Sequence, residues 1–207
     1  MAILKNGILG PVSGKVGGKV FSSWNGVEVV KDLPQKTTQE PTQLQLDQRD
    51  KFALLTAFFA FIKEVIGIGF KSLSKKMTTI NAAVKFNKDV VTGDSGNFSI
   101  NYSQVSVSMG DVLEPEGAAL KHGSKCELII TWYDQVYDND GDDRGVVLFY
   151  NETINKCYVV AENLLRKDLQ LIFTKDRDQC DDIFHVWFFI KEAKGNNVSK
   201  SIYLGKG

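Results

Sequence analysis

The densest group of potential metal ligands in the sequence is the acidic run Asp138–Asp143, which reads DNDGDD. Carboxylates at alternate positions of a tight turn can converge on calcium, so Asp138, Asp140 and Asp142 form a weak candidate calcium site. The run is not an EF-hand, because Phe149 stands where the bidentate glutamate would fall. A solvated acidic hairpin loop is the simpler interpretation, and we expect no cofactor.

A second chemical signal lies in residues 13–19, SGKVGGK, which have the composition of a phosphate-binding loop. The spacing fails, because only three residues separate Gly14 from the Gly18-Lys19 pair, where four are needed. Val20 also replaces the Ser or Thr that would contact magnesium, and a hairpin follows where a helix is required. The sequence therefore argues against nucleotide binding.

Groups for nucleophilic catalysis are scarce. The only histidines are His122, in a loop, and His185, which alternates with aromatic residues in an expected strand. No Ser or Cys stands in a recognisable nucleophile motif. We therefore expect a protein that is not an enzyme.

The three cysteines, Cys126, Cys157 and Cys180, are odd in number and scattered along the chain. This pattern favours reduced, partly buried thiols in a protein assembled in a cytoplasm. The first 18 residues are interrupted by glycines and a proline before any apolar core forms, so no secretory signal is expected.

Charge is balanced overall, with 25 basic and 25 acidic residues, but unevenly distributed. Residues 1–91 carry 13 Lys and Arg against 7 Asp and Glu, and residues 92–207 carry 12 against 18. Such asymmetry either guides docking between molecules or stabilises one part of the chain against the other.

The basic cluster Lys71, Lys75 and Lys76 has no interleaved aromatic platform, so no nucleic-acid partner is expected. The most apolar stretch of the chain, residues 52–62, is too short to span a membrane.

Three segments must position these residues, and the first is residues 1–34. Five glycines in residues 1–18 predict an extended arm, and Asn25-Gly26 between two strand-like runs predicts a type I′ hairpin. A lone hairpin is marginal in water and needs a cover. We therefore assign partner binding to Lys15, Lys19 and Trp24.

The second segment, residues 35–90, is expected to be helical. A helix is predicted from Gln43 to Ile66, with a shorter one across Lys75–Asn87. Two adjacent apolar stripes, which include Phe52 and Phe59, are wider than one packing partner demands. The long helix is therefore either sandwiched within its own domain or placed at an oligomer interface, where Phe52 and Phe59 would contact a partner.

The third segment, residues 91–207, is expected to form an antiparallel β-sandwich of the immunoglobulin or fibronectin kind. Trp132 closes an alternating strand and is predicted to plug the core. Residues 183–190 are apolar on both faces, which predicts a central strand covered by the long helix or by a partner. The candidate strands are Phe98–Tyr102, Gln104–Met109, Cys126–Tyr133, Gly145–Tyr150, Lys156–Ala161, Leu169–Thr174, Ile183–Ile190 and Val198–Leu204.

Two stretches carry a family resemblance. The first is NGILGPVSGKVGGKVFSSWNGVEVVKDLP followed by PTQLQLDQRDKF, and the second is GVVLFYNETINKCYVV followed by VWFFIKEAKGNNVSKSIYLG. Both are similar to an uncharacterised family of proteins of this length from Bacteroidota and their phages. That family combines a Gly-rich SGKVG motif, a W-x-G hairpin, a Q-x-x-x-R-x-x-F helix and an SxSxYLG-like C-terminus. Lys31 stands where the family often has Arg. The resemblance implies the layout of arm, helix and sandwich, and it transfers no catalytic residue.

These observations predict a non-catalytic structural or docking protein that acts by protein–protein contacts in a homo- or hetero-oligomer. The leading hypothesis is a bacteriophage virion component assembled in the host cytoplasm: a capsid decoration, a head-fibre component or a neck or tail adaptor. The alternative is a bacterial surface or periplasmic module that binds glycan or protein, with calcium dependence as a variant of it.

Overall fold

The computed structural model describes residues 2–4, 12–24, 26–35, 39–75, 77–124, 126–133, 142–161 and 163–207. The chain divides into two compact units, Met1–Gln43 and Leu44–Gly207. The junction lies near the predicted boundary at residue 34. The predicted boundary at residue 90 falls inside the second unit, because the helices pack directly on the sandwich.

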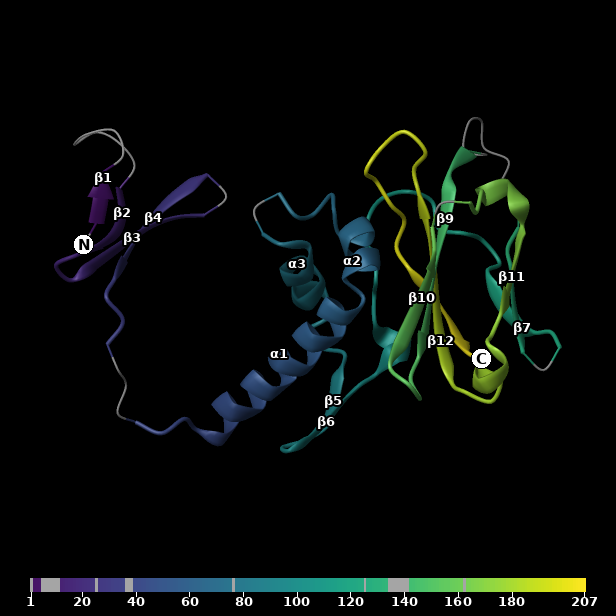
Figure 1. Ribbon diagram of the computed structural model, residues 1–207, viewed down its shortest axis with the longest axis horizontal. Coiled ribbons are helices and arrows are strands. Elements are labelled where there is room, and N and C mark those ends of the chain that lie inside the picture. The colour runs from purple at the N-terminus through teal and green to yellow at the C-terminus, as the bar shows by residue number, and fades with distance from the viewer. Residues whose placement is uncertain are drawn as a thin grey trace. The chain divides into compact units, whose positions relative to one another are not determined.

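The first unit is a four-stranded antiparallel sheet in the order β1-β2-β3-β4 (Figure 1). Its strands are β1 Ala2–Leu4, β2 Val12–Val16, β3 Lys19–Trp24 and β4 Val27–Asp32. The predicted hairpin is confirmed, with Trp24 opposite Val27. The prediction of an extended arm is wrong for β1 and β2, since Gly17 at φ +56° allows the tight turn that folds β2 back onto β3.

The helical segment is bent. It forms α1 (Gln43–Phe61) and α2 (Lys63–Gly69) at 89° to each other, so the prediction of one helix to Ile66 is wrong. The break falls at Ile62, which is itself buried. The third helix, α3 (Thr79–Phe86), begins where the Thr78 hydroxyl accepts a hydrogen bond from the Asn81 backbone N–H. No single described helix is long and apolar enough to cross a membrane, and only the bent pair α1 and α2 has the length and composition together.

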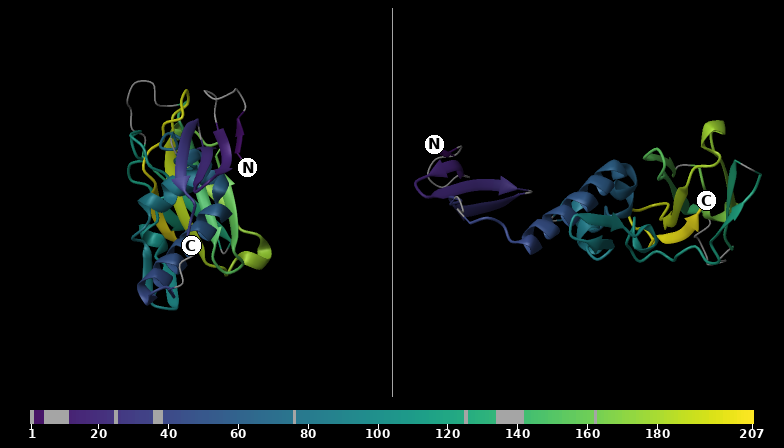
Figure 2. Two further views of the ribbon diagram at one scale, coloured as in Figure 1. Left: turned by 90° about the vertical axis from the view of Figure 1, so that its left-hand side faces the viewer. Right: turned by 90° about the horizontal axis from the view of Figure 1, so that it is seen from below.

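The second unit is layered. A four-stranded antiparallel sheet has the order β10-β9-β12-β13, and a three-stranded sheet has the order β11-β8-β7. The helices lie on one side of the four-stranded sheet and the three-stranded sheet on the other (Figures 1 and 2). The bounds are β7 Ala119–His122, β8 Glu127–Thr131, β9 Arg144–Asn151, β10 Lys156–Val160, β11 Gln170–Thr174, β12 Phe184–Lys191 and β13 Ile202–Lys206. A hairpin of β5 (Val91–Asp94) and β6 (Asn97–Ile100) completes the unit.

Alternate residues of β12 feed two separate hydrophobic cores. Trp187 and Phe189 pack toward the helices, with Leu55, Phe59 and Ile66 in the same cluster. The other face of the strand supplies the core between the two sheets, with Phe184, Val186, Phe188 and Ile190. The prediction of a central strand covered by the helical segment is therefore confirmed, and so is the fold class of an α+β chain with an Ig/fibronectin-like sandwich.

Trp132 is buried just beyond β8, where its indole N–H donates to the Arg166 carbonyl at 2.6 Å. Its ring centroid lies 5.0 Å from that of Phe188, so the prediction of a core residue is confirmed. The prediction of a strand over Gln104–Met109 is wrong. The Val107 backbone N–H donates its hydrogen bond to the Ser201 hydroxyl and not to the backbone of a neighbouring strand. Strands β5 and β7 were not predicted.

Candidate functional site

The first candidate is the surface of the N-terminal sheet. Phe21 lies opposite Val30 on one face, and Val27, three residues before Val30 on β4, lies on the other. None of the described side chains of residues 12–23 and 26–35 is buried, and Val27 and Val30 are each 56% exposed. The sheet therefore presents apolar side chains on both faces without a core of its own.

The predicted partner-binding lysines lie on this sheet. Lys15 is exposed on β2, and Lys19 on β3 forms an exposed ion pair with Asp32 on β4. Trp24 ends β3, and its side chain lies outside the described part of the chain. The sheet thus brings Lys15 and Lys19 onto adjacent strands.

The two phenylalanines assigned to partner binding on α1 have opposite environments. Phe52 is 55% exposed and remains a candidate contact. Phe59 is fully buried in the core beneath the helices, so its assignment to partner binding is wrong. The physical reason is the four-stranded sheet, which itself covers the stripe that contains Phe59 and leaves no partner surface there.

The calcium candidate lies largely outside the described residues, because Asp138 and Asp140 do. Asp142 forms an ion pair with Lys167 at 3.4 Å. The neighbouring Asp143 is buried, accepts a hydrogen bond from the Ala193 N–H at 3.0 Å and lies 3.9 Å from the Arg166 guanidinium. Within the described ranges no group of three or more His, Cys, Asp or Glu residues is placed to hold a metal ion.

The sequence predicts three reduced cysteines, and this prediction is wrong for two of them. Cys126 and Cys180 form a disulfide that joins the start of β8 to the turn before β12, across a separation of 54 residues. Cys157 on β10 is the free cysteine of the three. Burial raises the pKa of its thiol, so it is a poor nucleophile at neutral pH. The prediction failed because spacing along the chain does not show which cysteines meet in the fold.

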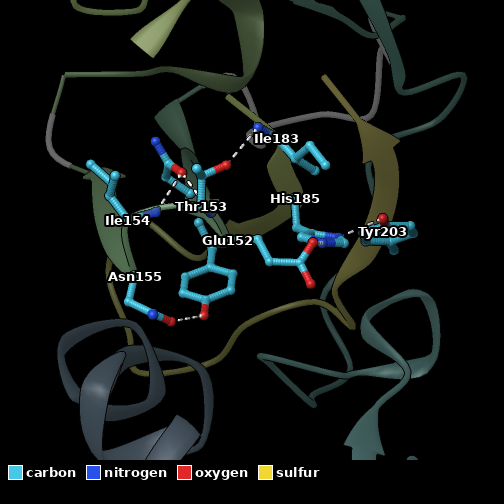
Figure 3. Close-up of polar contacts among 9 residues, drawn as sticks. Glu152, Thr153, Ile154, Asn155, Ile183, His185 and Tyr203 are labelled. Carbon is cyan, nitrogen blue, oxygen red and sulfur yellow. Dashed lines mark hydrogen bonds and ion pairs between the residues drawn. The ribbon is translucent and has the colours of Figure 1, made fainter. Parts of the chain in front are cut away.

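A buried polar network crosses one end of the four-stranded sheet (Figure 3). The His185 Nδ1 lies 2.8 Å from the Tyr203 hydroxyl on β13, and its Nε2 lies 3.1 Å from the Glu152 carboxylate that follows β9. His185 is 1% exposed, whereas the Glu152 side chain is 41% exposed. The network therefore links a buried imidazole to a carboxylate that reaches the surface.

The electrostatics of this network favour a neutral imidazole. Burial lowers the pKa of His185, and the Glu152 carboxylate opposes this shift. Burial raises the pKa of Tyr203, with a further contribution from Glu152, so the phenol stays protonated. With a neutral imidazole and a protonated phenol, the Tyr203 hydroxyl donates to Nδ1 of His185, and Nε2–H of His185 donates to the Glu152 carboxylate. This order joins β9, β12 and β13 through side chains.

An aromatic pocket lies beside this network. It has a volume of about 330 Å³ and is lined by Phe58 and Phe61 of α1, Tyr102, Tyr150 of β9 and Asn155, among others. The rings are in mutual contact: the centroids of Phe58, Tyr102 and Tyr150 lie 5.5–5.6 Å apart. The Tyr150 hydroxyl donates to the Asn155 side-chain oxygen at 2.7 Å (Figure 3). The pocket thus has apolar walls and a hydroxyl-bearing end.

The sequence predicts His185 as a residue of the sandwich, but it does not predict Glu152, Tyr203, Tyr102 or Tyr150 at this site. The available signal was that two predicted strands, Phe98–Tyr102 and Gly145–Tyr150, both end in tyrosine. A tyrosine at a strand end can keep its ring in the core and its hydroxyl at a polar boundary. That signal does not show that the two tyrosines meet.

A family model described as "Family of unknown function (DUF6266)" matches residues 11–205, which is nearly the whole chain. The chain belongs to this family. The DUF6266 match covers β2 to β4 of the N-terminal sheet, the helices and nearly all of the sandwich.

Among solved structures, the DUF6266 chain is similar to the fn3 domain of human contactin 1. The match has 15% identity and a TM-score of 0.28, and it covers 56% of this chain and 82% of that one. No curated protein matches the sequence.

Proposed function

We propose that this DUF6266 protein is a non-catalytic docking protein that works inside a larger assembly. The observation that carries the proposal is the exposed N-terminal sheet. Ordering a residue costs about 1–2 kcal/mol of backbone entropy, and burial of apolar surface is what offsets it. A sheet with apolar side chains on both faces and no core of its own needs that burial from outside the sheet, and the proposal assigns it to a partner.

The assembly in this proposal is a bacteriophage virion, where the protein is a capsid decoration, a head-fibre component or a neck or tail adaptor. The resemblance to proteins of Bacteroidota phages supports this choice. In this arrangement the N-terminal sheet anchors the protein to neighbouring subunits, with Lys15 and Lys19 at its polar positions. The sandwich carries the outward-facing surface.

The second candidate is a surface or periplasmic binding module, and the disulfide fits it as well as it fits a virion surface. Disulfides persist in oxidising compartments, which include the periplasm and the surfaces of cells and virions. Cys126–Cys180 joins segments 54 residues apart and fits such a setting. The two candidates differ in what co-purifies with the protein from its native source: particle proteins in the first case, and envelope components in the second.

A test of docking through the N-terminal sheet uses two charge insertions in β4. Val27→Lys and Val30→Lys place a charge on opposite faces of the sheet, and each should abolish co-purification with the native partners. Ile172→Lys on β11 is the matched control, because Ile172 is 54% exposed in a strand of the other unit. Retention of the same partners by both β4 variants would refute the proposal.

A further inference from the structure

The aromatic pocket beside the His185 network has the features of a binding site for a cation. Four of its lining residues, Phe58, Phe61, Tyr102 and Tyr150, carry aromatic rings, and Phe61 is 45% exposed at the surface. Phe61 and Phe58 both meet the Tyr150 ring nearly edge-on, at interplanar angles of 72° and 82°. Ring faces carry partial negative charge, and a cavity bounded by them attracts cations within about 6 Å.

The polar end of the pocket adds negative potential. The Tyr102 ring centroid lies 4.2 Å from that of His185, whose Nε2 lies 3.1 Å from the Glu152 carboxylate. Glu152 acts on both pocket tyrosines, since its charge contributes to the raised pKa values of Tyr102 and Tyr150. No Lys or Arg lines the pocket among the described residues. The charge of the site is therefore complementary to a cation.

We propose that this pocket receives the side chain of a lysine or arginine from a partner protein. The aliphatic stem of such a side chain packs along Phe58 and Phe61, and its cationic head lies at Tyr102 and Tyr150, where the charge of Glu152 acts from outside the pocket lining. An uncharged apolar side chain would gain nothing from the negative charge of Glu152, and that charge would repel an anion. The inference rests on the proposed docking function and names the chemistry of one contact of the second unit.

The experiment uses the full chain and a matched pair of small probes, Nα-acetyl-lysine methylamide and Nα-acetyl-norleucine methylamide. The two share a linear aliphatic stem and differ in the charged head. Binding is followed by NMR through the ring signals of Tyr102 and Tyr150. We expect the lysine probe to bind about tenfold more tightly than the norleucine probe, which is the factor that a cation–π and carboxylate contact supplies.

Two variants test the assignment. Glu152→Gln keeps an oxygen to accept from His185 and removes the charge, so it should erase most of the preference for lysine and leave norleucine binding unchanged. Glu114→Gln removes an exposed carboxylate whose charge does not act on Tyr102 or Tyr150, and it should change neither affinity. Phe61→Leu at the rim should weaken the lysine probe several-fold, and it provides a second test if the Gln variant does not fold.

Equal affinity for the two probes, or no saturable shift of the ring signals with either, would overturn the proposal. These outcomes are independent of the docking test, because the small probes need no assembly partner. A pocket that prefers lysine in a protein whose β4 variants keep their partners would retain this inference and refute the anchoring role of the N-terminal sheet.

Discussion

His185 is a buried titratable residue whose ionisation is tied to the fold. Its ring is buried among Tyr102, Tyr203 and Trp187, with Glu152 as its anionic neighbour and Lys206 as the cation that opposes protonation. Burial lowers the pKa of His185 below its ordinary value of 6.5. The unfolded chain therefore binds the proton more readily than the native state does.

The sign of the pH effect follows from this difference. Because the native state binds fewer protons near and below pH 6.5, the free energy of unfolding falls as the pH falls through that value. We expect His185→Gln, measured by urea unfolding between pH 8 and pH 5, to be less stable at pH 8 and to show a smaller acid-induced loss than the wild type. His122→Gln makes the same substitution at an exposed histidine and controls for the replacement of histidine by glutamine. An unchanged slope in His185→Gln would contradict the assignment.

Trp132 is the second residue with a large predicted effect. Trp132→Ala removes a buried indole that packs on Phe188 and leaves the Arg166 carbonyl without its donor. The loss should be about 3–5 kcal/mol in the free energy of unfolding, measured by chemical denaturation. Tyr133→Ala is the control, since Tyr133 is 68% exposed and should cost less than about 1 kcal/mol. A small effect for Trp132→Ala would mean that the indole is not part of the core.

At the scale of elements, the disulfide ties the three-stranded sheet to the turn that leads into β12. Closing a loop of 54 residues restricts the unfolded chain, which corresponds to about 4 kcal/mol of stabilisation in the chain-entropy treatment. Replacing both Cys126 and Cys180 with Ser should therefore lower the melting temperature, and a reductant should have the same effect on the wild type. Cys157→Ser, at the free cysteine, should preserve the response to reductant. Insensitivity of the wild type to reductant would show that the bond does not support the native state.

Elements with a clear period can be predicted from the sequence, and elements set by packing cannot. Residues 183–190 are apolar on both faces over the length of one strand, which is enough to identify a central strand covered on both sides. The bend at Ile62 has no such signal, because no Pro or Gly lies between Phe52 and Ile66. The candidate site also has no signal in the sequence. Glu152 and Tyr203 lie 33 and 18 residues from His185, and only the pairing of β9, β12 and β13 brings the three residues together.

At the scale of the whole molecule, the two units differ in where their stability comes from. Every buried apolar side chain that the structure describes lies between Leu55 and Val198, so the second unit contains its own complete cores. The first unit has strand pairing and turns but no buried side chain among its described residues. The second unit therefore holds the buried cores, and the proposed docking surface lies on the first unit.

This division predicts the outcome of removing the N-terminal unit. The fragment Leu44–Gly207 keeps both cores and the disulfide, so its free energy of unfolding should stay within about 0.5 kcal/mol of the value for the corresponding transition of the full chain. The same fragment should lose co-purification with native partners, because the surface that needs cover is gone. Calorimetry measures the stability of the fragment, and affinity purification measures its loss of partners. Failure of the fragment to fold would show that residues 1–43 complete the second unit, and retention of the partners would place docking on the sandwich or its aromatic pocket.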